Sequence, residues 1–225
     1  MSSVLSKSRI ESFSDIVFGL ALSIGALSLI GRPVSDAEAV TADLVAFGYS
    51  FLILTTVWLR YTSVATTLPI ERPVTLRLNL VMLLLVAIEP YLFNLVFASP
   101  GVPTAPFSQF VSALFGLDLG GLFAILAAFD HLALRPEAAG VPEARRRNLR
   151  TYRNRHVIGS TFFLASALPW FGTWLVFGTA SPMLTVRELF WILPVVIGSV
   201  WGRAEWILRR QRRPGSGTHD GETPN

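Results

Sequence analysis

RIESFSDIVFGLALSIGALSLI, residues 9–30, opens with charged and polar side chains and then continues without a charge from Ile16 onward. The uncharged part, residues 16–30, together with the polar turn before it approaches the roughly 20 residues that a helix needs to cross a bilayer. Five further apolar runs follow, at residues 44–59, 78–97, 107–134, 157–177 and 189–208. We therefore predict an all-α membrane protein with six transmembrane helices.

The overall composition agrees with a membrane protein. Hydrophobic residues make up 52% of the chain and charged residues only 15%, whereas soluble domains carry roughly 25% charged residues. The first apolar run lacks a small-residue cleavage site and is followed by five more, so we expect it to be retained. The chain has no cysteine, which excludes disulfides, thiolate metal sites and cysteine nucleophiles.

The distribution of basic residues predicts the orientation of the helices. If six helices alternate in direction, all of the 19 Lys and Arg residues except Arg32 and Arg187 fall on one side of the membrane. Cytoplasmic loops carry an excess of Lys and Arg. We therefore expect a multi-pass protein of the cell membrane with both termini in the cytoplasm.

Two regions of different composition follow from this pattern. Residues 1–208 form the predicted six-helix transmembrane domain, and residues 209–225 form a tail that is first basic and then rich in turn-forming and polar residues. We expect this tail to be disordered and cytoplasmic. The basic cluster EARRRNLRTYRNR, residues 143–155, flanks two predicted spans, so it favours contact with anionic lipid headgroups over nucleic acid.

No arrangement of residues predicts catalysis. The histidines His131, His156 and His219 are scattered, while metal-dependent and nucleophilic enzymes need clustered ligands or a base beside a nucleophile. The glycines of FGLDLGGL, residues 115–122, fall within a predicted span and are typical of close helix packing. We expect no enzyme activity and no cofactor.

The first helix carries an apolar stripe. Leu20, Ile24 and Leu27 recur at helical spacing, and Ser23 lies on the same face. In a single helix such a stripe is most often a packing or lipid-facing surface. Repeated around a symmetry axis, it would stack rings of branched side chains that close a pore by dewetting, beside a ring of hydroxyls. Periodicity alone leaves these alternatives open.

The same helix resembles the signature of a known family. Arg9, Phe13, Ser14 and Asp15, followed by IVFGLALSIGAL, are similar to the first-helix motif of the transmembrane protein 175 potassium channels, in their prokaryotic branch with a single six-helix repeat. The resemblance in the order of spans covers roughly residues 9–208, whereas the specific motif lies in the first helix. A tryptophan near the end of the second span, Trp58, also agrees.

This resemblance implies a homotetramer that conducts K⁺ passively, with the first helix of each subunit lining a central pore. It implies that Leu20, Ile24 and Leu27 form the hydrophobic constriction and that Ser23 is the hydroxyl involved in potassium preference. The implied network that supports the pore helix consists of Arg9, Phe13, Ser14, Asp15 and Trp58.

The sequence departs from the family pattern at several positions. Arg60 and Tyr61 follow the tryptophan where the family often carries histidines, so the supporting network is expected to be wired differently or to be weaker. Ser23 stands where the family usually has threonine. Ile16 and Gly25 also differ from the usual residues. Selectivity is therefore the part of the resemblance that transfers least directly.

Two acidic residues within predicted spans keep another function open. Glu89 lies in the third span and Asp118 in the fourth, and carboxyl groups within a membrane are costly unless they are paired, protonated or hydrated. They predict, as an alternative, a proton-coupled secondary transporter that uses both groups. A structural role for both, and a membrane scaffold without transport, also stay open.

Overall fold

A computed structural model of the chain describes residues 7–30, 37–68, 72–98, 105–135, 142–174 and 185–194. Helices account for nearly all of these residues. Their bounds are α1 Lys7–Ile30, α2 Ala37–Ala65, α3 Pro73–Ala98, α4 Pro106–Ala133, α5 Glu143–Ser166 and the short α6 Pro169–Thr173. Residues 186–194 form a further helical segment. The described residues therefore confirm the predicted all-α class.

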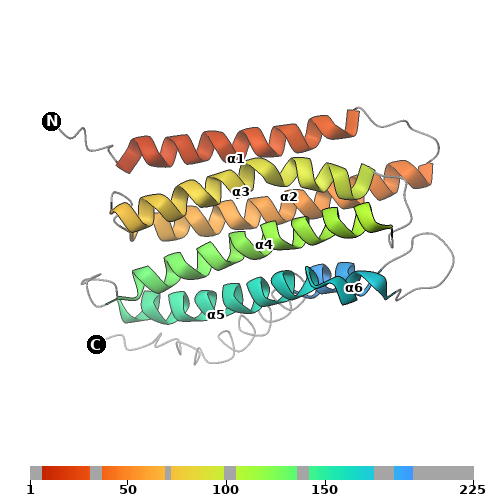
Figure 1. Cartoon of the computed structure of the whole chain (residues 1–225). Coiled ribbons are helices and arrows are strands. Elements are labelled where there is room, and N and C mark those ends of the chain that lie inside the picture. Colours follow the sequence, from red (N-terminus) through yellow and green to blue (C-terminus); the bar gives the residue numbers. More distant parts are fainter. Residues whose placement is uncertain are drawn as a thin grey trace, which may run out of the picture.

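Helices α1 to α5 lie side by side and alternate in direction, as an up-and-down bundle (Figure 1). Helix α1 lies at one edge of the bundle, where it packs mainly on α3 and α2. Helix α4 packs on α3 on one side and on α5 on the other, and α4 and α5 share the most extensive contact. Among the described helices, this arrangement leaves one long face of α1 uncovered.

Four of the described helices are long and apolar enough to cross a membrane: Lys7–Ile30, Ala39–Ala65, Pro73–Phe97 and Pro106–Ala133. They coincide with the first four predicted spans. The predicted fifth span, residues 157–177, does not form one helix, because α5 begins earlier, at Glu143, and ends at Ser166, and the short α6 starts at Pro169. Only part of the predicted sixth span is described, and the tail at 209–225 lies outside the described residues.

The interruption after α5 has a local cause. Leu168 is extended and Pro169 takes the first position of α6, and a proline both removes an N–H donor and restricts the residue before it. The carbonyl groups freed at the break accept from Arg187, whose Nε donates to Ser166 O over 2.7 Å and whose Nη2 donates to Leu168 O over 3.2 Å. Arg187 also donates to Gln109 O on α4, over 2.7 Å. A buried arginine therefore joins three segments at this end of the bundle.

The centre of the bundle is aromatic and aliphatic, and its closest packing lies between α4 and α5. Phe115, Leu119 and Leu122 of α4 have no exposed surface. Gly116 and Gly120 face α5 so closely that a Cβ atom on either would lie 2.6 Å from the nearest α5 side-chain atom. The glycine-rich stretch of α4 is therefore a packing surface.

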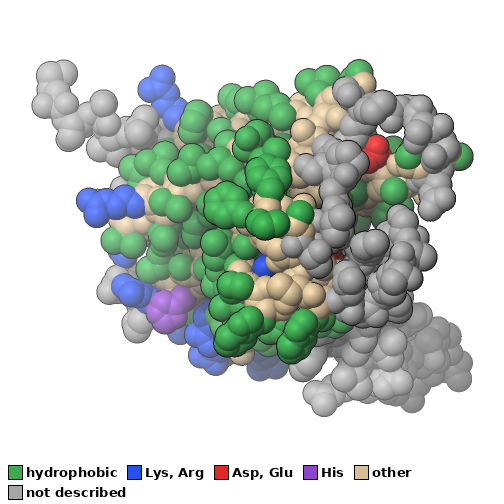
Figure 2. All heavy atoms as spheres, turned by 45° about the vertical axis from the view of Figure 1, so that its right-hand side comes forward, with side chains coloured by type: hydrophobic (Ala, Val, Ile, Leu, Met, Phe, Trp, Pro, Cys, Tyr) green, Lys and Arg blue, Asp and Glu red, His purple; other side chains and the backbone are tan. Residues whose placement is uncertain are grey.

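Basic side chains gather at one end of the bundle, and hydrophobic side chains cover much of the remaining surface in this view (Figure 2). Lys7 at the start of α1 donates to Thr66 O, just after α2, over 3.4 Å, and Arg145 near the start of α5 donates to Thr66 Oγ1 over 2.9 Å. The start of α1, the end of α2 and the start of α5 therefore share this basic end.

Candidate pore-lining helix

Helix α1 has one face that packs against its own chain. Its buried residues are Ile10, Ser14, Phe18, Ala21 and Gly25. They recur every three or four positions, which is the spacing of a single helical face. This face lies against α2 and α3. It fixes α1 in the bundle and determines which residues point the other way.

The opposite face of α1 is largely apolar, and the described residues leave it exposed. We refer to its six large residues as the apolar stripe. Their exposed fractions are 53% for Phe13, 66% for Ile16, 58% for Leu20, 45% for Ile24, 61% for Leu27 and 79% for Ile30. The three residues that were predicted as a constriction lie together within this stripe. Sequence reasoning had not assigned Ile16 or Ile30 to it, although both fit the same periodicity.

Small and polar residues accompany the apolar stripe. Ser23 is exposed, and its hydroxyl donates to Gly19 O over 2.8 Å. Since this bond uses the only proton of the hydroxyl, both lone pairs of Ser23 Oγ stay available to accept. A Cβ atom at Gly19 would meet no other atom of the described residues within 4 Å. Ser23 thus offers an acceptor oxygen on the exposed face of α1, amid branched apolar side chains.

A buried hydrogen-bond network holds the first turns of α1 against α2 and α3. Ser14 Oγ donates to Ile10 O over 2.9 Å, lies 2.9 Å from Tyr61 Oη, and lies 3.3 Å from Asn79 Nδ2. Because the proton of Ser14 is used within α1, the hydroxyl of Tyr61 and the amide of Asn79 are the donors. Ser14, Tyr61 and Asn79 are at most 3% exposed. The three hydroxyl and amide groups connect α1 to two helices at one point.

A second contact lies one residue further along α1. Trp58 Nε1 of α2 donates to Asp15 Oδ1 over 2.9 Å, on the exposed side of the helix pair. The structure therefore brings Ser14, Asp15 and Trp58 of the expected network into contacts between α1 and its neighbours. It places Phe13 on the apolar stripe instead, and the side chain of Arg9 is exposed.

Tyr61 and Asn79 are members of this network that sequence reasoning had not assigned to it. Tyr61 follows Trp58 by nearly one turn, which is a usable signal, whereas Asn79 is 65 residues from Ser14 along the chain. The ring of Tyr61 also packs on Phe18 and Phe129, with centroid separations of 6.1 and 6.2 Å. Tyr61 thus takes part in the network at a position where the resembled family often has histidine.

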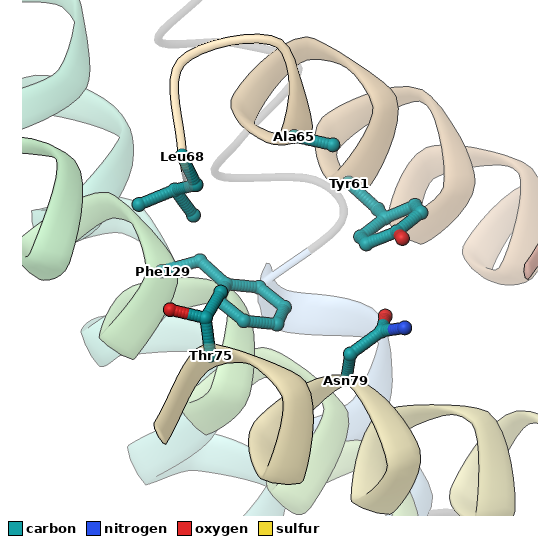
Figure 3. Close-up of a pocket in the computed structure, with 6 residues that line it drawn as sticks. All are labelled: Tyr61, Ala65, Leu68, Thr75, Asn79 and Phe129. Atoms are coloured by element: carbon teal, nitrogen blue, oxygen red, sulfur yellow. The ribbon is translucent and has the colours of Figure 1, made fainter. Parts of the chain in front are cut away.

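A small hollow lies behind Tyr61, and Figure 3 shows the side chains that line it. Its lining residues are Tyr61, Ala65, Leu68, Thr75, Asn79 and Phe129, and it has no room for a water molecule. Asn79 Oδ1 has no hydrogen-bond partner among the described residues. The hollow is a packing defect beside the network and is too small for a ligand.

The two acidic residues of the alternative function are buried in the middle of the bundle. Glu89 of α3 is 1% exposed and accepts from Ser50 Oγ of α2 over 2.6 Å, and Asp118 of α4 is 4% exposed. Within the described part of the chain, Glu89 Oε2 and both carboxylate oxygens of Asp118 have no hydrogen-bond partner. These groups lie away from the apolar stripe, between α2, α3 and α4.

The described residues contain no group of three or more His, Cys, Asp or Glu side chains that could hold a metal ion. A buried pair does occur, where His156 Nδ1 of α5 lies 2.7 Å from Asp130 Oδ2 of α4. Its two members belong to the contact between α4 and α5. The arrangement therefore joins two helices and offers no metal site.

Comparison with known proteins agrees with the resemblance of the first helix. Residues 9–90 match a family model described as "Endosomal/lysosomal potassium channel TMEM175", and this range spans nearly all of α1, α2 and most of α3. No curated protein sequence matches the chain.

One solved structure has a similar fold. It is described as the crystal structure of a lysosomal potassium-selective channel TMEM175 homolog from Chamaesiphon minutus. The TM-score is 0.57 at 15% sequence identity, and the match covers 85% of this chain and 96% of that chain. The likeness therefore extends over nearly the whole of the other chain and concerns the fold.

Proposed function

Because residues 9–90 match the transmembrane protein 175 family, we propose that this chain is one subunit of a passive, potassium-preferring cation channel. Copies of α1 line its central pore, and the channel is a homotetramer. K⁺ is the permeant ion, and the protein needs no cofactor and catalyses no reaction. The apolar stripe of α1 is the observation that carries this proposal.

The apolar stripe supports a pore because it is directional. One face of α1 is buried against α2 and α3, and the other exposes six large apolar residues from Phe13 to Ile30. One helix cannot enclose a passage, so several copies must face each other around an axis. In that arrangement Leu20, Ile24 and Leu27 form successive rings, and narrow rings of branched side chains gate ions by dewetting.

Ser23 supplies the polar element of the proposed pore. Its oxygen keeps two lone pairs free beside Leu20 and Ile24, so a ring of such oxygens replaces part of the hydration shell of a passing cation. The protein thereby favours cations over anions without a charged side chain on the stripe. We assign potassium preference to this ring.

The polar network at the start of α1 supports the proposed pore helix. Asp15 and Trp58 on one side, and Ser14 with Tyr61 and Asn79 on the other, hold the helix at its basic end. We place Arg9 in the same supporting role, at the exposed end of the helix. Phe13 belongs by its position to the lining rather than to the support.

The proposed location is the cell membrane, with six transmembrane helices and both termini in the cytoplasm. The gathering of basic side chains at one end of the bundle supports this orientation. Residues 1–208 form the channel domain, and residues 209–225 form a basic, disordered cytoplasmic tail. The partners are other copies of the chain and membrane lipids with anionic headgroups, and nucleic acid is not among them.

The test is flux through purified protein in liposomes. We expect K⁺ to leave along its gradient without ATP and without a coupled ion, and the rate to rise linearly with the gradient. Chemical crosslinking in the same membranes is expected to give four subunits. Liposomes that show no K⁺ conductance, or an assembly of two chains or fewer, would overturn the proposal, since one α1 per chain cannot enclose a pore in a dimer.

The buried carboxyl groups favour a second candidate, a proton-coupled secondary transporter. Glu89 and Asp118 are nearly inaccessible and have three carboxylate oxygens without a partner among the described residues. Intramembrane acids of this kind occur in proton relays. Flux that saturates with substrate, that is lost in Glu89→Gln and that ignores changes at Leu20 would favour the transporter. Absence of any flux would favour a scaffold.

A further inference from the structure

A cation–π contact joins α2 and α5 at the basic end of the bundle. The guanidinium carbon of Arg60 lies 3.5 Å from the centre of the Tyr152 ring, and that of Arg155 lies 5.9 Å from the same ring. Both distances are within the roughly 6 Å range of a favourable cation–π interaction. Two positive charges from different helices therefore share one aromatic ring.

The contact lies where the hydrocarbon of the membrane is expected to end. Arg60 is the first charged residue after the apolar run of α2, and Arg155 is the last arginine before the apolar part of α5. Helix α2 has 29 residues and is therefore about 43 Å long, which exceeds the roughly 30 Å hydrocarbon core. Tyrosine favours this boundary because its ring is apolar and its hydroxyl is polar.

The geometry leaves donors of Arg60 unused. A guanidinium that stacks on a ring keeps its N–H groups in its own plane, where they point away from the ring. Among the described residues, Arg60 has no carboxylate partner and donates no hydrogen bond. Tyr152 thus holds the side chain in place without consuming its donors.

The surroundings favour an anion. Residues 143–155 of α5 contain six arginines and one acidic residue, Glu143. The planar fork of arginine matches the oxygens of a phosphate group. Apolar side chains follow on the membrane side of both arginines: Leu59 is 55% exposed, and Val157 and Ile158 are each 49% exposed. A ligand with a phosphate and acyl chains contacts both the arginines and these apolar side chains, whereas a free phosphate contacts only the arginines.

We infer that Arg60 and Tyr152, with Arg155 beside them, form a binding site for the headgroup of an anionic phospholipid at this end of the bundle. Arg60 donates to the phosphate, Tyr152 orients Arg60, and the acyl chains lie against Leu59 and the exposed residues of α5. A lipid bound in this way bridges α2 and α5. The inference requires insertion in a membrane but not conduction.

The test is titration of the purified full chain in a neutral detergent with dioleoyl phosphatidylglycerol or dioleoyl phosphatidylcholine, followed by native mass spectrometry. We expect tighter binding of the anionic lipid to the natural chain. Arg60→Gln is expected to weaken that binding roughly five-fold, as for one basic residue near a charged membrane surface. Tyr152→Leu should weaken it similarly because Arg60 is released, and Tyr152→Phe should not, because the ring stays.

Arg147→Gln is the matched control, since Arg147 is exposed on the same helix and the charge change is the same. Equal losses in Arg60→Gln and Arg147→Gln would overturn the site in favour of a diffuse positive field. Equal binding of the two lipids by the natural chain would overturn it as well. Displacement of the lipid by millimolar inorganic phosphate would show a site for free anions instead. If Arg60→Gln fails to fold, the pair Tyr152→Leu and Tyr152→Phe decides.

Discussion

The hydroxyl oxygens of Tyr61 and Ser14 lie 2.9 Å apart in the buried contact between α2 and α1. Tyr61→Phe removes this bond and keeps the ring that packs on Phe18 and Phe129. We expect the free energy of unfolding, measured by thermal unfolding in detergent, to fall by about 1 kcal/mol, and K⁺ flux to fall because the proposed pore helix loses one of its anchors. Tyr91→Phe, at an exposed tyrosine of α3, is the control.

The pair Tyr61→Phe and Ser14→Ala extends that experiment. If the two hydroxyls act through each other, the double variant should lose clearly less flux and stability than the sum of the single losses. Strict additivity would mean that Tyr61 and Ser14 act independently, and the network would then not position α1.

Leu20→Asn places an amide on the apolar stripe of α1. We expect K⁺ flux through liposomes to rise and the preference for K⁺ over Na⁺ to fall, because a polar ring wets the constriction. Leu52→Asn on α2 is the matched control, since Leu52 is 61% exposed against 58% for Leu20 but lies outside the stripe. Unchanged conductance and preference in Leu20→Asn, or equal effects of both variants, would contradict the pore assignment.

Gly120→Ala tests the close packing of α4 and α5. Its Cβ atom would lie 2.6 Å from Leu164 Cδ2 and 3.1 Å from the backbone nitrogen of Leu164. We expect a loss of about 1–3 kcal/mol in thermal unfolding, as for other overpacked interiors. Gly48→Ala meets nothing within 4 Å and should be neutral or stabilising, since alanine favours a helix. Equal melting temperatures for the two variants would contradict this account.

Arg187→Met removes the donors that satisfy the carbonyl groups at the break between α5 and α6. Ser166 O, Leu168 O and Gln109 O would lose their bonds to the guanidinium, as would the hydroxyl of Ser112. We expect the free energy of unfolding to fall by roughly 3 kcal/mol.

Faster proteolysis between α5 and α6 should accompany that loss, and thermal unfolding with limited digestion measures both effects. The loss of stability in Arg187→Lys should be smaller than in Arg187→Met but still measurable, because one ammonium cannot reach all four acceptors. Arg150→Met, at an exposed arginine of α5, should change little. A loss in Arg150→Met as large as that in Arg187→Met would argue against the bracing role.

The sequence predicted the parts of the fold that depend on hydropathy. Four apolar runs form helices of spanning length, because a predominantly apolar stretch long enough to cross a bilayer has few other stable structures there. Hydropathy could not give the bounds of α5. Its first half, up to Arg155, is helical although it is highly charged, since arginine, glutamate and leucine are good helix formers.

The break after α5 was only partly predictable. Pro169 signals an interruption of the predicted fifth span. The carbonyl groups that the break leaves free accept from Arg187, which lies 21 residues from Ser166 along the chain. A local pattern carries no information about such a distant donor.

The candidate site was predictable to a similar extent. Periodicity placed Leu20, Ile24 and Leu27 on one face, but it could not decide between packing and exposure, because that depends on where α2 and α3 lie. The hydrogen-bond network of Ser14 could not be predicted from the sequence for a similar reason. Tyr61 and Asn79 are 47 and 65 residues from Ser14, so only the folded chain brings them together.

The one-sided packing of α1 has a consequence for how this protein can evolve. Substitutions on the outward face at Ile16, Leu20 or Ile24 remove few of the contacts that hold the subunit together, so they are nearly free of selection for folding. Substitutions of the buried Phe18 or Ser14 remove such contacts, so selection for folding acts on them directly. A lineage can therefore alter the chemistry of the outward face while inheriting an unchanged scaffold.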